Sequence, residues 1–185
     1  MNPTNGVNDT YRALFTCDKA EFFRSDGQLD THTEIAVSAE DNAEIRRVTV
    51  TNHSRHEKSI ALTSFAEIVL TDPSSDEAHP AFSNLFIRTE YEEKYNALLA
   101  NRRPRNKSTE PVWAFHCASV DGNMTAPVSY ETDRAKFIGR GNNPSNPAAM
   151  RPGQPLENSV GAVLDPVFSI RCRLKVPVGG RVSVS

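Results

Sequence analysis

The acidic run around residue 131 holds the side chains whose types come closest to a catalytic arrangement. Glu131 and Asp133 are carboxylic acids, and Arg134 follows them directly. A carboxyl group with a raised pKa beside a glycosidic bond can act as a general acid. However, a chain with 23 acidic residues offers many such candidates, and the run is equally typical of a cap and an ion pair that hold a loop. We expect Glu131, Asp133 and Arg134 to shape a site, not to react.

Other catalytic signatures are missing from the sequence. There is no Gly-x-Ser-x-Gly turn, and the five histidines have no motif context. No glycine-rich phosphate cradle follows a candidate strand. Oxygen ligands for a cation are available from Asp72, Asp76, Glu77 and His79, but this group lacks the alternation and the turn glycine of an EF-hand loop. These motifs therefore identify no catalytic residue, and we expect no metal site and no cofactor.

Polar side chains gather instead in segment 139–158, which has no strand periodicity. Its four prolines reduce the entropy lost when the segment becomes ordered. Its planar donors and acceptors suit sugar hydroxyls, and the candidate substrate-binding residues are Arg140, Asn142, Asn143, Arg151 and Asn158. Arg140 and Arg151 are the strongest of these, as donors to hydroxyl groups or counter-charges for an anion. The alternative is a surface loop fixed only by packing.

The elements that must position these residues show period-2 alternation, which predicts an all-β fold. The clearest strand is 167–176. One face carries the apolar residues Phe168, Ile170, Cys172, Leu174 and Val176, and the wet face carries Ser169, Arg171, Arg173 and Lys175. Segment 60–70 is predicted to be a central strand covered on both faces. Shorter strands are predicted at 31–37, 44–51, 85–89 and 112–120, in antiparallel sheets packed face to face.

Two segments should lack strands, 71–83 and 139–158, and long ordered loops are often functional. Between them, residues 132–138 are predicted to form one short helical turn, with Thr132 as the N-cap and Gly139 just past the end.

Composition excludes several classes of partner. The formal net charge of −2 provides no positive field for nucleic acid. No apolar run approaches the roughly 20 residues that span a bilayer, so we expect no direct membrane insertion. Cys17, Cys117 and Cys172 are widely spaced, and we expect free, buried thiols in a reducing compartment.

Several longer motifs, in chain order, resemble family 94 glycoside phosphorylases. They are residues 44–53 (EIRRVTVTNH), 62–67 (LTSFAE), 79–86 (HPAFSNLF) and 131–141 (ETDRAKFIGRG). With residues 18–22, 158–161 and 164–166, they are most similar to the carboxy-terminal part of cyclic β-1,2-glucan synthases. The resemblance covers nearly all of the chain beyond about residue 10.

The resemblance implies a large antiparallel β-sandwich, the galactose-mutarotase-like supersandwich. It would span residues 11–185, truncated at its C-terminus, after a disordered or extraneous segment 1–10. In that family an (α/α)6 barrel follows and holds the catalytic acid, so this chain alone should be inactive. The implied parent is an inner-membrane bacterial enzyme that makes glucan at the cytoplasmic face. The implied partners are β-glucan or oligosaccharide, the barrel and, in a homodimer, a second copy.

Two alternatives stay open. An autonomous carbohydrate-binding module would present exposed aromatic rings, whereas Trp113 lies inside a predicted strand with Phe115 on its face, which favours core packing. A fragment of a free-standing oligosaccharide phosphorylase is the second alternative, although segment 139–160 favours the synthase.

Overall fold

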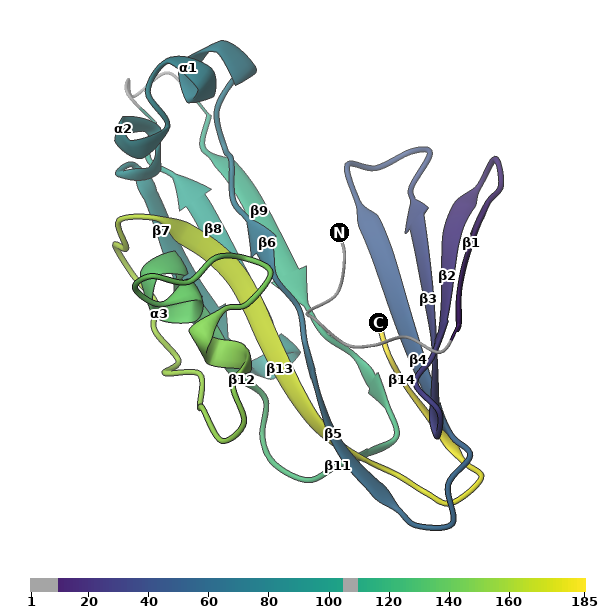
Figure 1. Cartoon of the computed structure of the whole chain (residues 1–185). Coiled ribbons are helices and arrows are strands. Elements are labelled where there is room, and N and C mark those ends of the chain that lie inside the picture. Colours follow the sequence, from purple (N-terminus) through teal and green to yellow (C-terminus); the bar gives the residue numbers. More distant parts are fainter. Residues whose placement is uncertain (1–9, 105–109) are drawn as a thin grey trace. The chain divides into compact units, whose positions relative to one another are not determined.

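The computed structural model describes residues 10–104 and 110–185, in which antiparallel strands dominate (Figure 1). The all-β expectation is confirmed. The predicted segment 1–10 lies outside the described residues, except for Thr10, which begins the first strand. The described chain divides into two compact units. The first contains residues 63–104, 110–118 and 128–171, and the second contains residues 10–62, 119–127 and 172–185.

The second unit contains a six-stranded antiparallel sheet in the order β1-β2-β3-β4-β14-β10. Its strands are β1 (Thr10–Phe15), β2 (Lys19–Ser25), β3 (Leu29–Val37), β4 (Glu44–Asn52), β14 (Arg181–Val184) and β10 (Val120–Asp121). Alternation assigns each strand an apolar and a polar face. Val50 and Val182 are paired and buried, while their neighbours Thr49 and Ser183 form a pair on the opposite face. The predicted strands 31–37 and 44–51 are thus confirmed as β3 and β4.

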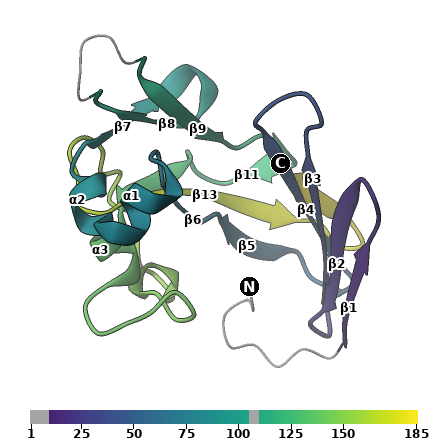
Figure 2. The same ribbon diagram turned by 90° about the horizontal axis from the view of Figure 1, so that it is seen from above.

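The first unit contains a three-stranded sheet of β7 (Ile87–Glu92), β8 (Ala97–Arg102) and β9 (Val112–Cys117), seen side by side in Figure 2. The 3-10 turn η1 (Glu93–Tyr95) joins β7 to β8. Predicted core packing of β9 is wrong, because Trp113 is 53% exposed and Phe115 is 71% exposed. Alternation shows that the two rings share a face, but in the described residues no element covers that face.

The longest strand is β13 (Pro166–Val176), which pairs with β11 (Asn123–Met124), β12 (Ser129–Asp133), β5 (Lys58–Thr63) and β6 (Ala66–Glu67). Its predicted apolar face is buried throughout. The predicted wet face is only half correct, since Arg173 and Lys175 are exposed but Ser169 and Arg171 are buried. Backbone of segment 149–154 covers that half of the strand.

The predicted central strand 60–70 is wrong in three respects. It is broken into β5 and β6, and each pairs with β13 alone among the described strands. Phe65 lies at the break and stacks on Phe137, with 4.7 Å between the ring centroids. Ser59 and Ala61 are exposed, so β5 is not covered on both faces.

Segment 71–83 holds two short helices instead of a loop, α1 (Pro73–Ala78) and α2 (Pro80–Asn84), and Asp72 caps α1 by accepting from the Ser75 amide at 2.9 Å. The predicted helical turn is present as α3 (Arg134–Ile138) and ends at Gly139, whose φ is +79°. Its N-cap is Asp133, however, because the Thr132 side chain is buried. No helix among the described residues is long and apolar enough to cross a membrane.

All three cysteines are unpaired, as expected. Only Cys172 is buried, and the expectation of burial is wrong for Cys17 and Cys117. Cys117 lies on the uncovered face of β9, and Cys17 lies in the exposed turn between β1 and β2.

Candidate functional site

The polar segment 139–160, called here the polar loop, is anchored to β13 by a buried arginine. Arg171 is only 5% exposed. Its Nη2 donates to the Ala149 carbonyl at 2.7 Å, and its Nη1 donates to the Gln154 carbonyl at 2.8 Å. Its Nε donates to the Thr63 hydroxyl at 2.8 Å. The planar guanidinium thus holds two points of the loop backbone against β13.

Glu131 provides a second anchor. It is 1% exposed, and its Oε1 accepts from the amides of Thr132 at 3.0 Å and Asp133 at 2.9 Å. Its Oε2 accepts from the amide of Glu157 in the polar loop at 3.3 Å. Charge-assisted hydrogen bonds of this kind are stronger than neutral ones. Both carboxylate oxygens therefore face backbone amides, which is the geometry of an anchor and not of a proton donor to a substrate.

Two of the candidate asparagines also accept hydrogen bonds from backbone amides. Asn158 has a left-handed φ of +57°, and its Oδ1 accepts from the Tyr130 amide of β12 at 2.8 Å. Asn143 Oδ1 accepts from the amides of Ser145 at 3.0 Å and Asn146 at 3.2 Å, which closes a turn within the loop. Their side-chain oxygens are thus engaged within the chain.

A small apolar cluster completes the support. Ala149 and Leu156 of the loop pack with Phe137 and Ile138 of α3, and Phe65 packs against the same cluster. Each of these four buried residues is at most 6% exposed. The loop backbone is consequently held by packing as well as by hydrogen bonds.

The remaining candidates form an exposed cluster on this support. Arg151 Nη2 donates to Asn142 Oδ1 at 2.8 Å, and Asn142 Nδ2 donates to the Arg140 carbonyl at 3.3 Å. Both Arg140 and Arg151 are exposed, and neither forms an ion pair with any acidic side chain in the described parts of the chain. The loop therefore presents two uncompensated guanidinium groups, one of them oriented by Asn142.

The start of α3 is held by a cap and an ion-pair arrangement. Asp133 accepts from the Ala135 amide at 2.8 Å. Arg134 Nε lies 2.8 Å from Glu67 Oε1 and 3.7 Å from Asp165 Oδ2. The hydrogen bond to Glu67 raises the pKa of Arg134, whereas burial raises the pKa of Asp165. These contacts fix the point at which the polar loop leaves the helix.

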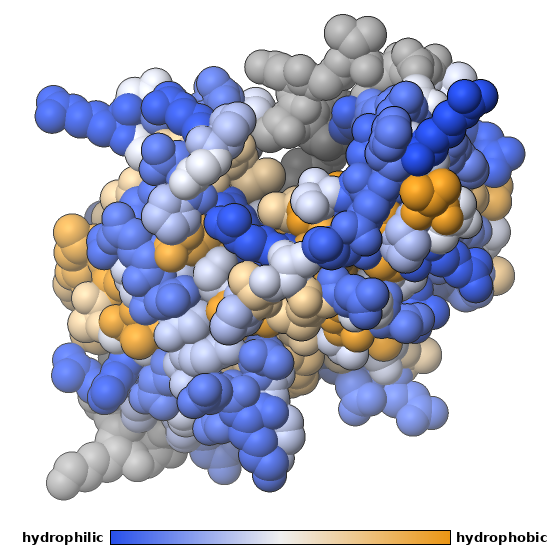
Figure 3. Space-filling model, turned by 90° about the horizontal axis from the view of Figure 1, so that it is seen from below, coloured by the Kyte–Doolittle hydropathy of each residue, from blue (hydrophilic) through white to orange (hydrophobic). Residues whose placement is uncertain are grey.

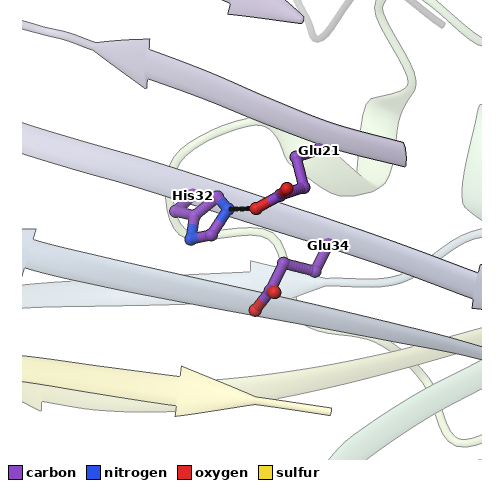
Figure 4. A group of neighbouring side chains, drawn as sticks. All are labelled: Glu21, His32 and Glu34. Atoms are coloured by element: carbon purple, nitrogen blue, oxygen red, sulfur yellow. Dashed lines mark hydrogen bonds and ion pairs between the residues drawn. The ribbon is translucent and has the colours of Figure 1, made fainter. Parts of the chain in front are cut away.

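A cluster in the second unit was not found from the sequence. Glu21, His32 and Glu34 point toward one another from β2 and β3 (Figure 4). His32 Nε2 lies 2.9 Å from Glu21 Oε1, while Lys19 Nζ lies 2.9 Å from Glu34 Oε1 and 3.3 Å from Glu21 Oε1. The hydrogen bond from Lys19 lowers the pKa of Glu34. Because this ammonium group contacts both carboxylates, the cluster is an ion-pair network in which Lys19 already provides a cation.

The uncovered face of β9 is a third feature of interest. Trp113 and Phe115 lie on one face of this edge strand, opposite Asn101 and Leu99 of β8. The face drawn in Figure 3 is mostly hydrophilic, with hydrophobic residues in separate patches. Exposed apolar patches often mark interaction sites.

Comparison with known proteins identifies the family. The glycosyl hydrolase 94 supersandwich domain matches residues 1–185. Cyclic beta-(1,2)-glucan synthase NdvB of Rhizobium meliloti (strain 1021) is 35% identical over 170 residues, which are 92% of this chain and 6% of that protein. Solabiose phosphorylase of Paenibacillus borealis is 29% identical over 143 residues, which are 76% of this chain and 17% of that protein.

The chain therefore spans a small part of the length of both relatives. The match over the whole sequence agrees with the antiparallel sheets of the structure and confirms the resemblance seen in the motifs. This chain belongs to the glycosyl hydrolase 94 supersandwich domain family.

Proposed function

We propose that this chain is a non-catalytic domain of a larger protein of the cyclic β-1,2-glucan synthase type, and that its polar loop forms part of the glucan site. One observation carries the proposal. A loop that contains no strand, only the 3-10 turn η2 (Ala148–Met150), is anchored by the buried side chains of Arg171 and Glu131. It presents two guanidinium groups without an ion pair among the described residues, Arg140 and Arg151. A binding group on a pre-ordered support loses less entropy when the ligand binds.

The chemistry of the cluster fits a sugar or a sugar phosphate. Each guanidinium has several donors in one plane, which match the oxygen atoms of sugar hydroxyls or of phosphate. Asn142 accepts from Arg151 and so limits the orientations of that side chain. In the proposed larger protein the catalytic acid belongs to an (α/α)6 barrel, and that barrel or a second copy of the chain is the partner of this domain. We place that protein at the inner membrane, with this domain on the cytoplasmic side.

The test uses the longer protein that contains this domain. Arg140→Ala and Arg151→Ala should each raise the KM for phosphorolysis of β-1,2-glucan. A hydrogen bond to a neutral sugar contributes about 0.5–1.5 kcal/mol, which corresponds to roughly 2- to 12-fold, and a bond to phosphate contributes more. The melting temperature should not change, because both side chains are exposed. Arg173→Ala is a matched control, since Arg173 is an exposed arginine of β13.

If both variants have wild-type kinetics, the polar loop does not bind glucan and has only a structural role. The non-catalytic assignment has its own test. The 185-residue chain alone, incubated with β-1,2-glucan and phosphate or with UDP-glucose, should release no glucose 1-phosphate and form no glucan. Product above a buffer control would refute that assignment.

A second candidate function is favoured by the exposed rings of β9. A carbohydrate-binding module stacks aromatic rings on sugar faces, and Trp113 and Phe115 are available for such contacts. Trp113 is the sole tryptophan of the sequence, so its fluorescence reports on this face alone. Titration of the chain with β-1,2-gluco-oligosaccharides should change the emission of the wild type, and Phe115→Ala should weaken the apparent affinity. Unchanged emission at saturating sugar would exclude this candidate.

The other alternative is that this chain is a fragment of a free-standing oligosaccharide phosphorylase and not of a synthase. The match to the synthase covers more of this chain, and at higher identity, than the match to solabiose phosphorylase. Phosphorolysis by the longer protein distinguishes the two, because a preference for a short oligosaccharide of another linkage over β-1,2-glucan would favour the phosphorylase.

A further inference from the structure

The polar face of the six-stranded sheet in the second unit carries a pocket of about 400 Å³. Strand register brings His32, Thr49, Ser183 and Asp121 into one row across β3, β4, β14 and β10. Neighbouring strands lie roughly 4.8 Å apart, so this row presents a polar group at each such step. Glu34, Arg47 and Arg181 also line the pocket.

A second pocket of about 380 Å³ shares His32 with the first and extends toward β2 and β1. Phe23 of β2 lines it, and the Phe23 ring stacks on His32 with 4.3 Å between the centroids and 8° between the planes. The guanidinium of Arg12 lies 4.4 Å from the centroid of Phe23 on the other side. The two pockets together are called here the sheet trough. His32 lies at their junction and is held there by its stacking on Phe23.

The charges of the first pocket indicate what kind of ligand it suits. Glu34 and Asp121 contribute two negative charges, and Arg47 and Arg181 contribute two positive charges, so these four charges cancel. A pocket with balanced charge selects neither a polyanion such as a nucleotide nor a metal cation. Its volume lies within the range of small-molecule sites.

Two of these charged groups have no partner. Asp121 and Arg181 are exposed, and within residues 10–104 and 110–185 neither makes a side-chain hydrogen bond or an ion pair. By contrast, Glu34 is paired with Lys19, and Arg47 Nε donates to the Ser185 hydroxyl at 3.1 Å. A free carboxylate can accept from hydroxyl groups, and a free guanidinium can donate to them. The pocket thus offers both kinds of partner that a sugar hydroxyl requires.

We propose that the sheet trough is a binding site for a neutral oligosaccharide, separate from the polar loop. Asp121 accepts from sugar hydroxyls, Arg181 donates to them, and the hydroxyls of Thr49 and Ser183 provide further contacts. The outward polar face of an antiparallel sheet is commonly only solvated. The hollow in this face and its two unpaired, opposite charges are what distinguish it from such a surface.

The experiment uses the full 185-residue chain and isothermal titration calorimetry. The probes are short β-1,2-linked gluco-oligosaccharides, with glucose 1-phosphate and magnesium chloride as charged comparators. Asp121→Ala and Arg181→Ala should each weaken oligosaccharide binding by about tenfold, which corresponds to about 1.4 kcal/mol. Both residues are exposed, so the melting temperature should remain that of the wild type.

Matched controls come from exposed residues outside the trough, Asp41→Ala and Arg173→Ala, which should bind as the wild type does. The polar-loop proposal is tested separately, by the KM of Arg140→Ala and Arg151→Ala in the longer protein. The proposal is overturned if no oligosaccharide gives a binding isotherm, if both trough variants bind as tightly as the wild type, or if glucose 1-phosphate or magnesium is preferred.

Discussion

Replacement of Glu131 by glutamine tests whether this buried carboxylate anchors the polar loop. The glutamine oxygen can take the place of Oε1 and keep the bonds from the Thr132 and Asp133 amides. The new NH2 group then lies where Oε2 was, 3.3 Å from the amide nitrogen of Glu157, and one donor faces another. A buried donor left without its acceptor costs about 1–3 kcal/mol. For a chain of this length, that corresponds to a fall in Tm of roughly 2–12 °C.

Urea denaturation and a thermal melt of the full chain measure this loss directly. Glu40→Gln is the control, because Glu40 is exposed and its carboxylate has no hydrogen bond among the described residues, so its stability should stay within about 0.5 kcal/mol of the wild type. Glu131→Ala removes all three hydrogen bonds and should be less stable than Glu131→Gln. The reasoning fails if Glu131→Gln is as stable as the wild type. If that variant also abolished turnover in the longer protein, Glu131 would be a reacting group.

Three further predictions concern stability and reactivity. A thiol reagent should modify Cys17 and Cys117 in the folded chain but Cys172 only after unfolding, because burial encloses that thiol and raises its pKa. Rapid modification of all three cysteines in the folded chain would contradict this. Burial also raises the pKa of Asp165 above its ordinary value of 3.8, so stability from this group is lost as pH rises through the raised pKa. In urea denaturation, Asp165→Asn should therefore gain stability relative to the wild type as the pH rises from the ordinary pKa to the raised pKa. A difference in unfolding free energy that does not depend on pH would be evidence against this. Arg171→Lys should cost at least about 1.5 kcal/mol in the same assay and speed proteolysis within the polar loop, because one ammonium cannot reach all three acceptors; unchanged cleavage would refute the anchoring role.

Local patterns predicted those parts of the fold that depend on neighbours along the chain. The alternation of residues 167–176 correctly placed five apolar side chains on one buried face of β13. The helical turn before Gly139 was also predictable, because a positive φ at a helix end favours glycine. Its N-cap was misplaced by one residue, since Thr132 and Asp133 are both good caps and only the burial of Thr132 distinguishes them.

The candidate site, too, was only partly predictable from the sequence. Sequence composition pointed to the polar loop, and the structure brings Arg140, Asn142 and Arg151 together there. It could not show that Asn143 and Asn158 bond to backbone, since their partners depend on how the loop folds back. The sheet trough was missed because its row of side chains comes from strands far apart in the sequence.

The sequence by itself determined the strand period, the all-β class and the family, because these depend on side-chain alternation and on motifs that are continuous in the chain. Only the tertiary structure decided which faces are covered. Arg171 alternates as a solvent-facing residue but is buried under the polar loop, whereas Trp113 and Phe115 alternate as core residues but are exposed. Alternation defines two faces of a strand, but whether a face meets water depends on segments from elsewhere in the chain.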